Sequence, residues 1–131
     1  MLEIVKNFLE EKIAPDFIIL FGSYASGDIH INSDLDIAFY KQNCKYSSND
    51  LFLLSLELEK LVNIPVDLVN LSTASTVFRA EIFANGNVLS FKDEDILDEY
   101  HMNAFSMYAR LNEERAEIFE EIMRSGTVYG N

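Results

Sequence analysis

The feature that most constrains the fold is a pair of apolar, strand-like runs joined by a short turn of small residues. FIILF (17–21) is an unbroken apolar run, as expected for a strand buried on both faces. DLDIAFY (34–40) is the second run, and Gly22 and Ser23 open the link between them. Because so short a link favours an antiparallel pair, the sequence predicts that these two strands lie side by side in opposite directions.

A third strand is predicted at IPVDLVNL (64–71), with Pro65 near its start. A helical pattern over residues 49–62 separates it from the second strand, and a helical connection favours a parallel pair. Asn49 or Asp50 is the predicted cap of this helix. Its predicted buried stripe consists of Leu51, Leu54, Leu58 and Leu61.

The remaining pattern completes one α/β domain over residues 1–131, with a mixed sheet of the α+β type. An amphipathic helix starts near Leu2 and ends before Pro15, and a second helix covers 72–86 with Gly86 as its C-terminal cap. A short strand is predicted at 87–91. A long helix then follows from about Glu94 to Arg124, and its apolar side chains predict that it serves partly as an interface.

Composition limits the partners and the compartment. Asp and Glu number 22 against 10 Lys and Arg, a formal charge of −12, which argues against direct binding of nucleic acid. A nucleotide carried with magnesium remains allowed, since the metal supplies positive charge. A single cysteine, no signal-peptide pattern and no membrane-length apolar run predict a cytoplasmic protein.

Three aspartates are predicted to meet at one edge of the sheet. Asp34 and Asp36 are two residues apart on one strand, so they point to the same face about 7 Å apart. Asp67 stands near the start of the parallel third strand. The predicted pairings bring these starts to the end of the first strand, where Gly22 and Ser23 lie, so all five residues should converge.

Crowded carboxylates raise one another's pKa unless a cation is present, and magnesium is commonly held by one or two carboxylates plus substrate phosphates. Gly22 permits close approach of the backbone, while Ser23 and the following amides suit an anion. Each feature alone has a simpler interpretation: Asp34 and Asp36 as a solubilising pair, Asp67 as a charge that blunts a sheet edge. The turn is neither a Walker loop nor a dinucleotide-binding fingerprint.

The pattern of Gly22 and Ser23, ten intervening residues, Asp34-x-Asp36 and the later Asp67 resembles the nucleotidyltransferase superfamily that includes DNA polymerase beta. The compact chain resembles the minimal nucleotidyltransferases, the MNT antitoxins of HEPN–MNT toxin–antitoxin pairs. The resemblance is strongest from Phe17 to Leu71.

That resemblance implies transfer of AMP from ATP, with two Mg²⁺ ions, to a tyrosine hydroxyl of a partner HEPN RNase toxin, which is thereby neutralised. It implies that Asp34 and Asp36 ligate the metals and that Asp67 completes the site and helps to deprotonate the hydroxyl. Gly22 and Ser23 would hold the outer phosphates of ATP. A hetero-oligomer with the toxin is a further implication.

Two alternatives stay open at this point. One is a non-catalytic antitoxin that neutralises the toxin by binding, and the other is a small-molecule nucleotidyltransferase. Many relatives also carry a basic residue where this chain has Ser26, which leaves triphosphate binding and catalysis open. His30 could replace that cation, whereas His101 and Arg79 are not assigned to the site.

Overall fold

A four-stranded mixed sheet forms the centre of the computed structural model, which describes residues 1–125. The strand order is β3-β2-β1-β4. β1 (Phe17–Phe21) pairs antiparallel with β2 (Leu35–Tyr40), and β2 pairs parallel with β3 (Val66–Asn70). β4 (Asn87–Phe91) pairs antiparallel with β1 on its other side. The predicted mixed sheet and both predicted strand pairings are therefore confirmed.

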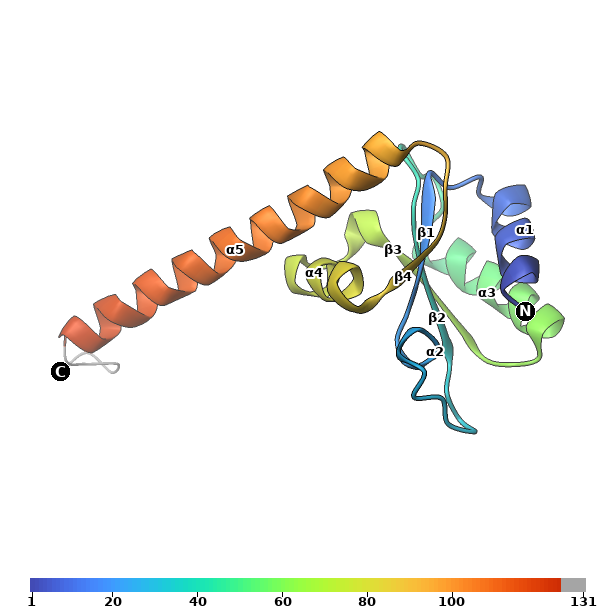
Figure 1. The fold of residues 1–131 in the computed structure, drawn as a ribbon, viewed down its shortest axis with the longest axis horizontal. Helices are drawn as coiled ribbons and strands as arrows, with labels where there is room; N and C mark the ends of the chain where they lie inside the picture. The colour runs from blue at the N-terminus through green and yellow to red at the C-terminus, as the bar shows by residue number, and fades with distance from the viewer. Residues whose placement is uncertain (126–131) are drawn as a thin grey trace.

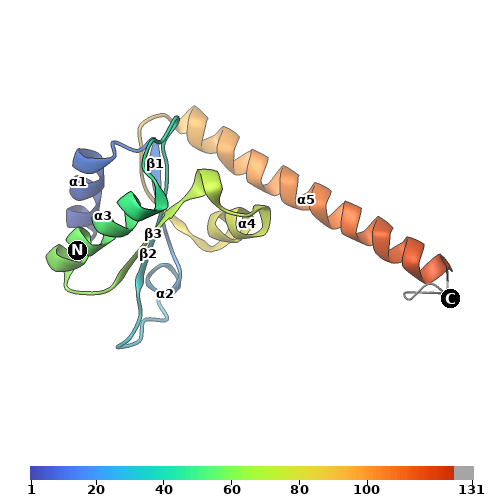
Figure 2. The ribbon, with the colours of Figure 1, turned by 180° about the vertical axis from the view of Figure 1, so that it is seen from behind.

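Helices cover both faces of the sheet. α1 (Leu2–Lys12) and α3 (Ser48–Val62) lie on one face, while α4 (Thr76–Asn85) and α5 (Glu94–Ser125) lie on the other, as Figures 1 and 2 show. Two short helices complete the chain: α2 (Ser23–Ser26) follows β1, and η1 (Leu71–Thr73) follows β3.

Alternate residues of the strands supply two separate cores. Leu35, Ile37 and Phe39 of β2 are buried against the α1–α3 side. Ala38 of the same strand is buried on the α4–α5 side, together with Phe17 and Ile19 of β1. Because successive side chains of a strand point to opposite faces, Asp36, two residues before Ala38, also points toward the side of α4 and α5.

The start and the buried stripe of α3 differ from the sequence prediction. Ser47, rather than Asn49 or Asp50, is the cap, and its hydroxyl accepts a hydrogen bond from the N–H of Asp50 at 3.1 Å. The Asp50 carboxylate accepts in return from the N–H of Ser47 at 2.9 Å, which completes a capping box. Leu61 is 52% exposed, and Ser55 takes a buried position instead.

Gly86 follows the last residue of α4 as its C-terminal cap, as predicted. Its backbone is extended (φ −86°, ψ 168°), and its N–H donates to the carbonyl of Ile82 at 2.7 Å. A Cβ at this position would lie 2.5 Å from the carbonyl oxygen of Ile82, 2.6 Å from Cγ2 of Ile19 and 2.9 Å from the carbonyl oxygen of Leu20. Glycine is therefore required by close packing against both the end of α4 and β1.

α5 has the predicted length, and most of it extends away from the sheet (Figures 1 and 2). Leu97 and Ala104, near its start, are its buried residues. Large exposed apolar side chains occur along it: Met102, Phe105, Met107, Ile118, Phe119 and Met123. Among residues 1–125, no helix combines the length and the apolarity that crossing a membrane requires.

Gly86→Ala is expected to lower the free energy of unfolding by about 2 kcal/mol, because the added methyl group overpacks the contact with β1. Urea unfolding followed by circular dichroism measures the change. Gly27→Asn is the matched control, since a Cβ at Gly27 meets nothing within 4 Å and asparagine tolerates its left-handed backbone (φ +83°). Equal stability of the two variants would contradict the packing argument.

Candidate active site

The strand register brings the three aspartates together. Asp36 is opposite Phe21 of β1 on one side and opposite Asp67 of β3 on the other. Asp34 immediately precedes β2, one residue outside the strand in which it was predicted. All three aspartates lie at the end of the sheet where β1 is followed by α2. They therefore lie close to Gly22, as predicted.

Asp36 is the electrostatic centre of this group. Burial, then the negative charge of Asp67, then that of Asp34 raise the pKa of Asp36 from the ordinary value of 3.8 to about 6. Asp34 and Asp67 are exposed to solvent, whereas Asp36 is partly buried between them and the turn. The site therefore favours a bound proton or a bound cation at Asp36.

Gly22 packs directly over the Asp36 carboxylate. Its backbone (φ 70°, ψ −152°) lies in a region that is essentially restricted to glycine. A Cβ built at Gly22 would also collide with Oδ2 of Asp36. Both the conformation and the contact exclude a side chain here, so the turn and the central carboxylate form one unit.

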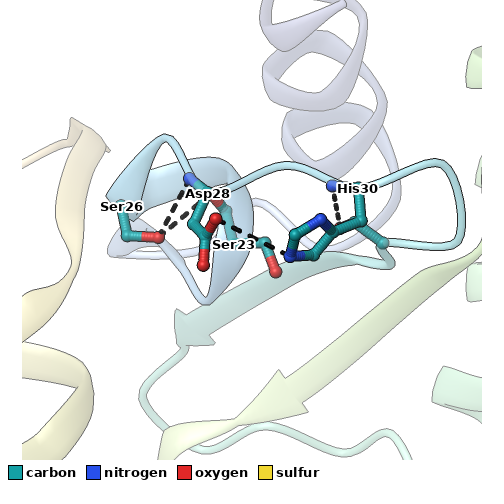
Figure 3. Close-up of polar contacts among 5 residues, drawn as sticks. Ser23, Ser26, Asp28 and His30 are labelled. Atoms are coloured by element: carbon teal, nitrogen blue, oxygen red, sulfur yellow. Dashed lines mark hydrogen bonds and ion pairs between the residues drawn. The ribbon is translucent and has the colours of Figure 1, made fainter.

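Local contacts order the turn that follows Gly22 (Figure 3). The Ser26 hydroxyl donates to the carbonyl of Ser23 at 3.2 Å and accepts from the N–H of Asp28 at 3.3 Å. His30 Nε2 lies 3.6 Å from a carboxylate oxygen of Asp28, and both side chains are mostly exposed. Ser26 therefore links the two ends of this turn, while the N–H groups of Ala25 and Ser26 each donate to the carbonyl of Gly22 at 3.1 Å.

The donor set fits magnesium. Asp34, Asp36 and Asp67 offer only hard carboxylate oxygens, the ligands that magnesium prefers. Within residues 1–125, no group of three acidic, histidine or cysteine side chains is drawn close enough to enclose a metal ion unaided. Magnesium is commonly held in proteins by one or two carboxylates together with substrate phosphates and water.

Two hollows flank the aspartates, and no sequence motif indicated either of them. A groove of about 610 Å³ lies on the β3 side and includes Asp34 and Asp67 in its lining. A smaller pocket of about 350 Å³ lies on the β1 side, between α4 and the turn of Gly22 and Ser26. Phe78 of α4 lines both hollows.

Arg79 and His101 have contacts away from the aspartates. Arg79 donates from Nε to the carbonyl of Ala74 at 3.0 Å and from Nη2 to the carbonyl of Ser72 at 3.2 Å. It thus holds the connection between η1 and α4. The His101 ring stacks on Phe83 with centroids 4.9 Å apart.

Comparison with known proteins identifies the family. The family model described as Polymerase beta, Nucleotidyltransferase matches residues 3–95. The chain belongs to this nucleotidyltransferase family. The match includes the turn at Gly22 and all three aspartates.

Individual relatives and solved structures are similar to this nucleotidyltransferase over nearly its whole length. Protein adenylyltransferase MntA of Shewanella oneidensis is 36% identical over 122 residues, which cover 92% of this chain and 86% of the relative. A chain of a toxin–antitoxin crystal structure with AMP-PNP matches at 31% identity and a TM-score of 0.82, covering 93% of this chain and 98% of that one.

A second solved complex contains a tri-AMPylated Shewanella oneidensis HEPN toxin with an MNT antitoxin. One of its chains matches this nucleotidyltransferase at 28% identity with a TM-score of 0.75, covering 93% of this chain and 95% of that one.

The raised pKa of Asp36 predicts a pH-dependent stability difference in metal-free protein. Because the pKa of Asp36 is higher in the folded protein (about 6) than its ordinary value of 3.8, ionisation of this carboxyl opposes folding. The wild type therefore loses stability as the pH rises through this window, whereas Asp36→Asn has no carboxyl to ionise and does not. The variant should therefore gain on wild type across that window and keep a constant advantage above it. Because the carboxylate is partly exposed, we expect an advantage on the order of 1 kcal/mol.

Urea unfolding in EDTA at several pH values measures this difference. Asp98 is an exposed residue near the start of α5, and Asp98→Asn is the control, which should show no such trend. An Asp36→Asn variant that is less stable than wild type at pH 8 would contradict the electrostatic account.

Proposed function

We propose that this nucleotidyltransferase transfers AMP from Mg-ATP to a tyrosine hydroxyl of a partner HEPN-family RNase toxin and so neutralises it. The observation that carries the proposal is the packing of Gly22 against Asp36, with Asp67 and Asp34 beside it. The likeness to protein adenylyltransferase MntA and to chains of toxin–antitoxin complexes supports the choice of substrate and partner.

Each site residue receives a role. Asp34 and Asp36 would hold two Mg²⁺ ions, with Asp67 completing the set, and the ions would stabilise the entering and leaving oxygens of an in-line displacement. Gly22 and Ser23 would bind the outer phosphates through the backbone at the start of α2 and the Ser23 hydroxyl. The raised pKa of Asp36 supports this assignment, since a bound cation relieves the repulsion among the carboxylates.

In the chemical step, the acceptor oxygen attacks the α-phosphorus of ATP. The bond from that phosphorus to the bridging oxygen of pyrophosphate breaks, and pyrophosphate leaves toward the turn of Gly22 and Ser23. Asp67 accepts the proton of the hydroxyl, because it stands beside Asp36 on the neighbouring strand and is open to solvent. The AMP remains esterified to the acceptor.

The turn keeps its shape without the basic residue common in relatives. Ser26 closes α2 through its hydroxyl, which leaves neutralisation of the triphosphate to the metal ions. The formal charge of −12 suits a basic protein partner, and the exposed apolar residues of α5 suit a hetero-oligomer with the toxin. We also assign the chain to the cytoplasm and treat residues 1–131 as one domain.

The proposal is tested by mixing the protein with Mg²⁺, α-labelled ATP and a HEPN-family partner protein. Label should appear on the HEPN protein and disappear when its acceptor tyrosine is changed to phenylalanine. Asp36→Asn should lower the rate by at least about a hundredfold, because the central metal ligand is lost.

Asp67→Asn should lower kcat with little change in the KM for ATP, as expected for the group that takes the proton. Glu11→Gln, at an exposed position of α1, serves as the acidic control, and circular dichroism verifies that each variant is folded. Protection of RNA without any label on the HEPN protein would instead establish neutralisation by binding, and full activity of Asp36→Asn would remove the metal assignment.

A further inference from the structure

The position of the turn relative to Asp67 determines from which side the acceptor must come. In an in-line displacement, the attacking oxygen and the leaving pyrophosphate lie on opposite sides of the phosphorus. The strand order places Gly22, at the end of β1, on one side of Asp36 and Asp67, on β3, on the other. If pyrophosphate leaves toward Gly22, the acceptor hydroxyl arrives over β3.

β3 is an edge strand, and a groove of about 610 Å³ runs along it. One wall is a single face of α3, since its residues Ser48, Phe52, Ser55 and Glu59 recur at helical spacing. The other wall comes from η1 and the start of α4, where Thr73, Ala74 and Phe78 lie. Asp34 and Asp67 belong to the lining, so the groove is continuous with the proposed catalytic carboxylates.

The groove has a definite chemical character. Among residues 1–125, the charged residues that line it are Asp34, Glu59 and Asp67, with no lysine, arginine or histidine. Phe52 offers an apolar surface and is 59% exposed. Glu59 is partly engaged, because one of its carboxylate oxygens accepts from the N–H of Val66 at 3.0 Å. An acidic groove with an exposed aromatic ring suits a basic polypeptide segment better than a second nucleotide.

We propose that this groove along β3 holds the segment of the partner protein that carries the acceptor hydroxyl, with basic residues flanking that hydroxyl. The inference rests on the proposed function and adds to it the acceptor path and the charge of the segment. Seated there, the hydroxyl gives its proton to Asp67 and its oxygen bonds to the α-phosphorus, while pyrophosphate departs on the Gly22 side.

Phe52 and Leu53 provide a matched pair for the test. They are adjacent on α3 and similarly exposed, at 59% and 53%, but only Phe52 lines the groove. With the HEPN protein as acceptor, Phe52→Ala should raise the KM for the acceptor about tenfold or more and leave the KM for ATP within about twofold. Leu53→Ala should change neither value by more than about twofold.

Charge variants at the same two positions test the nature of the segment. Phe52→Lys should raise the KM for the acceptor further than Phe52→Glu does, because lysine repels a basic segment and glutamate attracts it. Leu53→Lys and Leu53→Glu should not differ from each other in this way. A Phe52→Lys variant that works as well as Phe52→Glu would overturn the assignment of a basic segment.

Photo-crosslinking separates failure of this inference from failure of the proposed function. A benzophenone side chain is placed at position 52 or at position 53, and the protein is irradiated with the HEPN protein. Crosslinking from 52 but not from 53 supports the groove even if wild type transfers no AMP, an outcome that refutes only the proposed transfer. AMP transfer by wild type with no crosslink from 52, or with equal effects of Phe52→Ala and Leu53→Ala, overturns the groove and leaves the proposed function standing.

Discussion

The register of β1, β2 and β3 is the constraint on which the rest of the site depends. It places Asp36 between the end of β1 and Asp67 of β3, and it lets the glycine turn rest directly on the Asp36 carboxylate. Like charges and partial burial make this position unfavourable for an ionised carboxylate and therefore favourable for a cation. A shift of one residue in either pairing would point Asp36 into the other core.

The same strand order gives the site two chemically different sides. On the β1 side, Gly22 leaves no room for a side chain beside Asp36, and we propose that the backbone and hydroxyl of this turn bind the phosphates. On the β3 side, an edge strand leaves an acidic groove open between α3 and α4. In an in-line displacement, the acceptor attacks the phosphorus from one side and pyrophosphate leaves from the opposite side. We therefore assign the leaving group to the β1 side of the site and the acceptor to the groove on the β3 side.

The sheet topology was predictable because the length and type of the connection between two strands favour either a parallel or an antiparallel pair. A short link between residues 21 and 34 favours an antiparallel pair, and a helix between the next two strands favours a parallel one, so the convergence of Asp34, Asp36 and Asp67 followed. The cap of α3 was not predictable with the same security, since Ser47, Asn49 and Asp50 all suit a cap and only the capping box distinguishes Ser47.

Features that depend on packing between segments distant in the chain could not be predicted from the sequence. Leu61 has the helical spacing of a core residue, yet it is 52% exposed, and Gly86 is required by its contacts with α4 and β1 rather than by a left-handed backbone. The groove combines residues from 34 to 78 that carry no common motif and meet only in the folded chain.

A crystal structure with AMP-PNP and manganese, in which anomalous scattering locates the ions, tests most directly whether Asp34, Asp36 and Asp67 hold the metal. We expect manganese bound directly to carboxylate oxygens of Asp34 and Asp36, with Asp67 in the same cluster and the phosphates over Gly22 and Ser23. Ions bound elsewhere, or an analogue bound away from Gly22, would contradict it.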